Sequence, residues 1–111
     1  ELYEEVGLES SDVKLLCQSK RWLRYHIPEP MRRKRSAPVC VGQKQKWYLL
    51  QLTASTDKIR FDAAGSPEFD GWEWVNYWYP VRSIVSFKKN VYRRALQEFA
   101  PINSRFELSR D

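Results

Sequence analysis

The chain has 111 residues, enough for one small domain with a single core, and 42% of them are hydrophobic, which is typical of a globular protein and excludes a disordered one. Its formal net charge is +5, and no apolar run reaches the roughly 18 to 20 residues that cross a bilayer, so no membrane partner is expected. Cys17 and Cys40 stand in apolar contexts without metal-ligand spacing, which predicts buried thiols in a reducing, cytoplasmic compartment.

The first eight residues, "ELYEEVGL", are unusually acidic. Glu1, Glu4 and Glu5 are spaced i, i+3 and i+4, so a helix would place their carboxylates on one face, where like charges repel. Two interpretations follow: a solvated helix end, or a site for a hard divalent cation such as Mg²⁺ that offsets the repulsion. Gly7 is predicted to end the helix in a left-handed conformation.

Strands are predicted for the middle of the chain. Residues 13–27 interleave apolar and polar side chains, as a strand does, and a proline-containing, basic loop follows. The run 46–53 is dense in apolar residues, which predicts a strand covered on both faces. The segment "KIRF" at 58–61 is a candidate third strand. The basic stretch 20–35 either attracts phosphates or forms a solvated loop.

The last third of the chain predicts one further strand and then helices. "GWEWVNYW" at 71–78 alternates with period two, as a half-buried strand does, and Pro80 suits the first turn of a helix. From Val91 an amphipathic helix that packs on the sheet is predicted, with Lys88 and Lys89 counted on its polar face, and it is expected to stop at Pro101, before a polar tail. The apolar face of that helix comprises Val91, Ala95, Leu96 and Phe99. The aromatic residues predicted to lie mainly in the core are Trp47, Trp72, Trp74, Trp78 and Tyr79.

Several motifs together resemble one protein family. The opening octet resembles the second half of the Nudix box, which ends in Glu-Glu, any residue, Gly and an apolar residue. "GQKQKWYLLQL" at 42–52, "PEFDGWEWV" at 67–75 and "YWYPVRSIVSFKKNVYRRAL" at 77–96 resemble one Nudix branch, the bacterial RNA pyrophosphohydrolases and the related dinucleoside polyphosphate hydrolases. The resemblance covers almost the whole chain, to about residue 100.

This resemblance carries an expectation for the fold. It implies an α+β domain of the Nudix type, with a mixed sheet sandwiched between helices. The first half of the box and the strands that precede it have no counterpart here, so residues 1–100 are expected to form the C-terminal two-thirds of a single domain lacking its N-terminal strands. Residues 101–111 are the predicted flexible tail, and the chain alone is expected to be a poor or inactive hydrolase.

The resemblance also implies a chemistry, the hydrolysis of phosphoanhydrides assisted by Mg²⁺, with Mn²⁺ or another divalent cation as a possible substitute. By this likeness Glu1, Glu4, Glu5 and Glu68 are the metal-binding carboxylates. The general base that takes a proton from the attacking water is expected to be Glu1, Glu5 or Glu68.

For substrate binding, the resemblance implies that Val85 and Phe87 pack against a base, with Phe87 the leading candidate for stacking. From its residue type alone, Phe87 is instead expected to be a core residue of the adjoining helix. Contacts to phosphates or to the RNA backbone, which position a substrate without reading its sequence, are expected from further residues, and no DNA readout is expected. These residues are Gln43, Lys44, Gln45 and Lys88.

Three functions are compatible with the motifs. The first is an RNA pyrophosphohydrolase that removes pyrophosphate from the 5′ end of triphosphorylated RNA, leaves a 5′-monophosphate and so promotes mRNA decay. The second is a dinucleoside polyphosphate hydrolase, acting for example on diadenosine tetraphosphate. The third is a noncatalytic fragment that binds RNA or a nucleotide.

Overall fold

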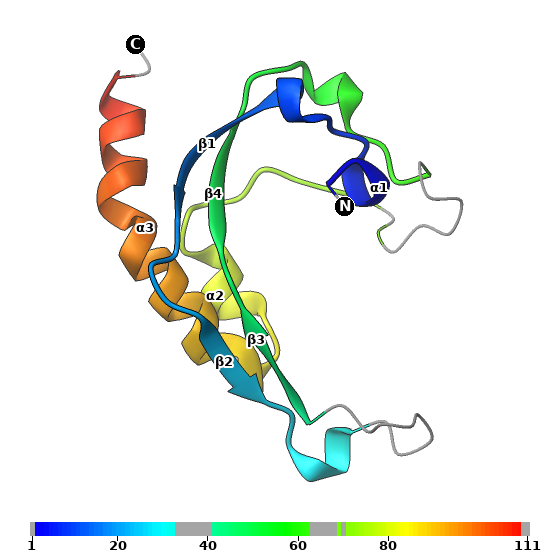
Figure 1. Cartoon of the computed structure of the whole chain (residues 1–111), viewed down its shortest axis with the longest axis vertical. Coiled ribbons are helices and arrows are strands. Elements are labelled where there is room, and N and C mark those ends of the chain that lie inside the picture. Colours follow the sequence, from blue (N-terminus) through cyan, green and yellow to red (C-terminus); the bar gives the residue numbers. More distant parts are fainter. Residues whose placement is uncertain (1, 33–40, 63–68, 70, 110–111) are drawn as a thin grey trace. The chain divides into compact units, whose positions relative to one another are not determined.

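A computed structural model of the chain describes residues 2–32, 41–62, 69 and 71–109. The chain divides into two compact units, each described by itself. Unit 1 comprises Glu1–Leu16 and Leu49–Val75, and unit 2 comprises Cys17–Tyr48 and Asn76–Asp111. Their short helices, two small sheets and long C-terminal helix confirm the predicted α+β class (Figure 1). None of the helices in the described part of the chain is long and apolar enough to cross a membrane.

Unit 1 begins with the predicted acidic helix, α1 (Leu2–Val6), and a 3-10 turn, η1 (Ser10–Asp12). Strands β1 (Val13–Gln18) and β4 (Tyr48–Leu52), most of whose residues belong to this unit, form a two-stranded sheet. In β4, the exposed Tyr48 and Leu50 alternate with half-buried neighbours. Because successive strand residues point to opposite faces, only one face of β4 is covered, and the expectation of a strand covered on both faces is wrong.

The candidate third strand at 58–61 is also wrong. Residues 56–58 form a 3-10 turn, η3 (Thr56–Lys58), whose cap Ser55 accepts a hydrogen bond from the N–H of Asp57. The N–H groups of Lys58 and Ile59 donate to carbonyls three residues earlier in the chain. A strand needs these donors for a ladder to a neighbouring strand, and here local turn bonds use them.

Residues 71–76 have no regular structure, so the strand predicted over 71–78 is wrong. Trp72 and Trp74 are 46% and 73% exposed, and their rings pack edge to face against each other at 5.8 Å. Trp78 and Tyr79 are exposed as well, so four of the five aromatic residues assigned to the core lie at the surface. The predicted alternation needs a partner strand, and the described residues supply none to this segment.

Unit 2 contains an antiparallel ribbon and the helices that pack on it. Strands β2 (Leu23–His26) and β3 (Gly42–Gln45) pair so that Leu23 lies opposite Gln45 and His26 lies opposite Gly42. The 3-10 turns and helices are η2 (Glu29–Met31), α2 (Tyr79–Ser83), η4 (Ser86–Lys88) and α3 (Lys89–Ser109). Pro80 lies in the first turn of α2, as predicted.

The core of unit 2 joins β2 to α3, which lie side by side in Figure 1. Leu23 and Tyr25 of β2 pack in one buried cluster with Val91 and Ala95 of α3, and Trp47 packs against this cluster. The predicted amphipathic helix, its packing on a sheet and the core position of Trp47 are therefore confirmed. The 3.6-residue period brings Val91, Ala95 and also the buried Phe99 onto one face.

Ser19 explains why residues 13–27 form two strands instead of one. Its N–H donates to the Trp47 carbonyl at 2.7 Å, and its fully buried hydroxyl accepts the Trp47 N–H at 2.9 Å while donating to the Arg21 carbonyl at 3.0 Å. A serine hydroxyl that bonds to nearby backbone competes with a regular ladder. The strand therefore breaks at Ser19, between β1 and β2.

The predicted end of the last helix at Pro101 is wrong, because α3 runs through this proline to Ser109. Proline lacks the N–H that would bond to the carbonyl of Gln97, so the helix loses one hydrogen bond there. Beyond it, Ile102 and Phe106 are both half-buried and stand four residues apart on one helical face. Burial of this face gives the last turns a reason to remain helical.

Among the described residues of unit 2, two titratable side chains have shifted pKa values. Burial, and after it the carboxylate of Glu98, raises the pKa of the free Cys17 thiol, so the half-buried thiol stays protonated at neutral pH. Burial, and after it Cys17, raises the pKa of Tyr77 to about 12. The Tyr77 hydroxyl donates a 2.7 Å hydrogen bond to the Leu96 carbonyl of α3. Cys40 lies outside the described residues.

Candidate functional site

Helix α1 carries the described part of the predicted metal site. Glu4 and Glu5 lie on this helix and Glu5 is exposed, while Glu1, Glu68 and the side chain of Glu4 lie outside what the structure describes. Among the described side chains, no group of three His, Cys, Asp or Glu could hold a metal ion. An exposed carboxylate supplies the oxygen donors that Mg²⁺ prefers, so Glu5 fits such an ion in chemistry and accessibility.

Gly7 ends α1 in the predicted left-handed conformation, with φ at +78°. Its N–H donates to the Tyr3 carbonyl at 2.8 Å, and the Arg60 N–H donates to the Val6 carbonyl at 2.8 Å. A Cβ on Gly7 would lie 2.5 Å from the Arg60 Cγ and 3.1 Å from the Lys58 carbonyl oxygen. The close approach of residues 58–60 thus requires a glycine at position 7. The same contact holds the C-terminal end of α1 in place.

A second contact ties the same segment to α1. An Arg60 guanidinium nitrogen donates to the Tyr3 hydroxyl at 2.7 Å, and the guanidinium carbon lies 5.6 Å from the centre of the Tyr3 ring. In the same unit, the buried Asp12 carboxylate accepts the Glu9 N–H at 2.9 Å and lies 3.9 Å from the Lys58 ammonium. The residues that make these contacts line a cavity of about 300 Å³ between α1 and the 57–60 segment of unit 1.

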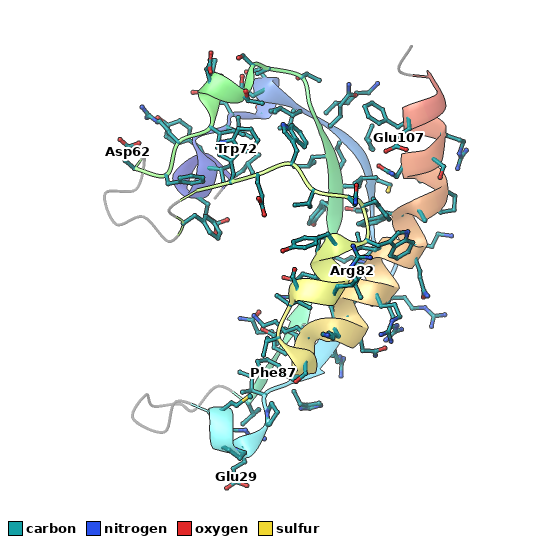
Figure 2. All side chains as sticks on the ribbon, turned by 180° about the vertical axis from the view of Figure 1, so that it is seen from behind. Glu29, Asp62, Trp72, Arg82, Phe87 and Glu107 are labelled. Atoms are coloured by element: carbon teal, nitrogen blue, oxygen red, sulfur yellow. The ribbon has the colours of Figure 1, made fainter. Side chains whose placement is uncertain are left out.

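Unit 2 brings together part of the predicted substrate-binding set. Phe87 is half-buried in η4, and its ring lies 5.6 Å from the ring of Tyr25 on β2. The Lys88 ammonium lies 5.3 Å from the Tyr25 ring centre and 5.9 Å from that of Phe87. Figure 2 shows Phe87 where η4 meets the β2–β3 ribbon (Figure 2). Phe87 thus packs against the core cluster and also borders a cationic side chain, and Val85 beside it is exposed.

The three predicted residues of the "GQKQ" segment occupy β3, where they point to different faces. Gln43 and Gln45 share the face of Tyr25 and Leu23, their cross-strand partners. The Gln45 amide is engaged there, since its nitrogen donates to the side-chain amide oxygen Oε1 of Gln43 at 2.9 Å and its oxygen accepts the Trp47 indole N–H at 3.1 Å. Lys44 lies on the opposite face and is exposed.

The sequence motifs missed two residues that the structure adds to this region. Tyr25 lies beside both Phe87 and Lys88, and Arg24 lies opposite Lys44 in the ribbon. A sequence feature that pointed to both residues was present in "WLRYH", because period-two alternation places Leu23 and Tyr25 on one face of a strand and their neighbours on the other. The partner strand, which decides what each face meets, could not be read from that alternation.

Charge is divided unequally between the two units. Unit 1 contains three Lys or Arg and ten Asp or Glu, whereas unit 2 contains sixteen Lys or Arg and only four Asp or Glu. The modest net charge of +5 is therefore the difference between an acidic unit and a strongly basic one. An acidic unit attracts divalent cations, and a basic one attracts phosphates.

Comparison with known proteins gives the chain close relatives, although no protein-family model matches it. It is 58% identical over 101 residues to a protein of Stutzerimonas stutzeri, 54% identical over 109 residues to one of Shewanella denitrificans, and 59% identical over 102 residues to one of Vibrio vulnificus. Each of these relatives is named RNA pyrophosphohydrolase. The matches cover 91%, 98% and 92% of this chain and 64%, 63% and 59% of the relatives.

The chain thus spans about three-fifths of the length of the curated relatives that it matches. Identity above half over nearly all of its residues is far beyond what shared composition produces. Over the segment that it spans, the chain is therefore a homologue of the bacterial proteins named RNA pyrophosphohydrolase, the Nudix branch that its motifs indicated.

Proposed function

We propose that the protein is a Mg²⁺-dependent RNA pyrophosphohydrolase, which removes pyrophosphate from the 5′ end of triphosphorylated RNA and leaves a 5′-monophosphate that promotes mRNA decay. The observation that carries the proposal is the identity of 54% to 59% to relatives named for this activity. The acidic helix α1 and the basic character of unit 2 agree with a phosphate substrate and a cationic cofactor.

Unit 1 supplies the catalytic carboxylates in this proposal. Glu1, Glu4, Glu5 and Glu68 would hold Mg²⁺, or Mn²⁺ or another divalent ion in its place. When bound, such an ion neutralises phosphate charge and lowers the pKa of a coordinated water. Glu1, Glu5 or Glu68 takes the proton of the attacking water. Gly7 and Arg60 hold the C-terminal end of α1, the helix that carries Glu5.

Unit 2 supplies the groups that hold the substrate. A base of the RNA stacks on Phe87 beside Val85, and the Lys88 ammonium, poised over the neighbouring rings, contacts a phosphate. Gln43, Gln45 and Lys44 bind backbone or phosphate oxygens without reading sequence, in agreement with an RNA substrate and with no DNA readout.

The proposal also covers the fold and the compartment. Residues 1–100 form the C-terminal two-thirds of a single Nudix-type domain in this proposal, with a mixed sheet between helices and residues 101–111 as its polar tail, into which α3 continues. The half-buried, protonated Cys17 thiol fits the cytoplasm, where a substrate RNA would be met.

The test uses the full-length gene product, with pyrophosphate release from 5′-triphosphorylated RNA as the measurement. Glu5→Gln preserves shape and removes the charge, so it should lower the rate by about 100-fold or more while the circular dichroism spectrum and unfolding midpoint stay unchanged. Glu73→Gln is the matched control, because Glu73 is an exposed glutamate of the same unit outside the proposed site. Equal rates for both variants would overturn the metal-site assignment.

Two further measurements separate the alternatives. A rate on diadenosine tetraphosphate that exceeds the rate on triphosphorylated RNA would assign the protein to the dinucleoside polyphosphate hydrolases. Binding of RNA without any Mg²⁺-dependent turnover would make it a noncatalytic binding protein.

A further inference from the structure

The face of the β2–β3 ribbon that turns away from the core carries a row of basic and aromatic side chains. Leu23 and Tyr25 are buried against α3, so period-two alternation sends Arg24 and His26, both exposed, to the opposite face. Trp22 precedes Arg24 by two residues, and Lys44 and Lys46 stand two apart on the other side. We call these five residues, Trp22, Arg24, His26, Lys44 and Lys46, the outer face.

Two like charges stand opposite each other on the outer face, without an ion-pair partner among the described residues. Arg24 lies directly opposite Lys44 in the register, and like charges at such a position destabilise an antiparallel pair. The ion pairs among the described residues, Lys58 with Asp12 and Arg60 with Asp62, both belong to unit 1. An anionic ligand bound across Arg24 and Lys44 would remove this repulsion.

Trp22 indicates which kind of anionic ligand the outer face would bind. It is 52% exposed, and the ammonium groups of Lys44 and Lys46 lie 4.8 Å and 5.6 Å from its ring centre. The Lys46 ammonium also donates to the Lys20 carbonyl at 3.0 Å, which fixes its position beside the ring. A flat, accessible ring flanked by positioned cations matches single-stranded nucleic acid, whose bases stack on aromatic rings while its phosphates meet lysines.

A concave surface adjoins this row. A cavity of about 360 Å³ is lined by Arg24, His26 and Lys44 of the outer face, together with Tyr25, Val41, Gly42 and Gln43. A cavity of this volume is within the range that small ligands and single nucleotides occupy. Cationic side chains at its edge would hold a phosphate close to the ring of Trp22.

We propose that the outer face binds single-stranded RNA, with a base stacked on Trp22 and successive phosphates at Arg24, Lys44 and Lys46. This surface engages the body of the RNA and is separate from Phe87 and Val85, which lie on other elements. The identification of this RNA as the hydrolase's substrate rests on the proposed function. The binding of RNA to the outer face does not rest on it, because such binding requires neither a 5′-triphosphate nor Mg²⁺.

The test is fluorescence anisotropy of a labelled 12-nucleotide oligouridine with a 5′-hydroxyl end, in EDTA, titrated with the full chain. Trp22→Ala should weaken binding by about 5- to 150-fold, the range for loss of one stacked base, and Trp22→Phe should restore most of the affinity. Lys44→Gln and Lys46→Gln should each lower the slope of log affinity against log salt by about 0.7.

Matched controls come from unit 1. Trp74→Ala removes a tryptophan that is 73% exposed, and Lys14→Gln removes an exposed lysine; neither should change RNA affinity. Glu5→Gln should bind the oligouridine as the unaltered chain does, so a failure of the proposed hydrolase would leave this result intact. Equal affinity for Trp22→Ala, Trp22→Phe and the unaltered chain would overturn the proposal. So would competition by polyglutamate that depends on Trp22, since that would identify an acidic protein segment as the ligand.

Discussion

The glycine that ends the acidic helix offers the sharpest test of the local structure. Gly7→Ala would place a Cβ at φ +78°, a conformation that costs an L-residue about 1 to 2 kcal/mol. The same Cβ would lie 2.5 Å from the Arg60 Cγ and 3.2 Å from the Arg60 backbone nitrogen, so the 58–60 segment must shift. Such overpacking adds about 1 kcal/mol or more. We expect a total loss of about 2 to 3 kcal/mol.

Amide hydrogen exchange measures this loss of stability at the contact between α1 and residues 58–60. The Arg60 N–H donates to the Val6 carbonyl at 2.8 Å, so its exchange rate reports opening between that segment and α1. A loss of about 2 to 3 kcal/mol should accelerate exchange about 30- to 150-fold. Gly71→Ala is the matched control, because a Cβ at Gly71 meets nothing within 4 Å and its φ is not in the left-handed region.

Gly7→Asn separates the two causes. Asparagine tolerates the left-handed conformation better than alanine. Gly7→Asn should therefore recover part of the stability lost in Gly7→Ala if the backbone dihedral angle causes most of that loss, and none if the contact with Arg60 causes it. Arg60 exchange that is as slow in Gly7→Ala as in Gly71→Ala would refute the reasoning.

Three further predictions concern unit 2. Folded-state burial raises the pKa of Tyr77 from its ordinary value of 10 to about 12. The protonated phenol therefore contributes stability that is complete below pH 10 and is lost as the pH rises toward 12; urea unfolding across this range should show the decline, and Tyr77→Phe should reduce it. Gly42→Ala would drive its Cβ into the Tyr25 carbonyl oxygen, so β3 should separate from β2 and the free energy of unfolding should fall by about 2 kcal/mol or more. The urea midpoint, compared with that of Gly71→Ala, measures this fall, and an unchanged midpoint would contradict the register. Pro101→Ala restores the N–H missing from α3 and should raise the thermal midpoint, with a gain of up to about 3 kcal/mol; a lower midpoint would show that α3 depends on the proline.

Local chemistry explains what could be read from the residues directly. The left-handed turn at Gly7, the first-turn Pro80 and the apolar face of α3 follow from residues within one or two helical turns, so spacing alone predicts them; the contact of residues 58–60 that also requires a glycine at position 7 is not among them. The acidic helix and the "GQKQ" and "VSFKK" segments likewise indicated the right homologues, because short motifs keep their order along the chain. Of the glutamates assigned to the metal, only the carboxylate of Glu5 has a described position.

Partners distant in the sequence decided the rest. Alternation in 71–78 predicted a strand, but a strand exists only where another strand accepts its hydrogen bonds, and the tryptophans of this segment are exposed. Ser19 divides two strands because its hydroxyl meets Trp47, 28 residues away. The α3 helix passes Pro101, where propensity alone predicts an end.

The sequence by itself determined the elements set by local geometry, the opposite charges of its segments and the identity of its relatives. Only the tertiary structure decided which side chains share a face. Arg24 opposes Lys44 and Lys46 reaches Trp22 because the ribbon has one register, and a shift of one residue would turn every one of these side chains to the other face. Register depends on the burial of Leu23 and Tyr25 against α3, a contact that no short stretch of sequence contains.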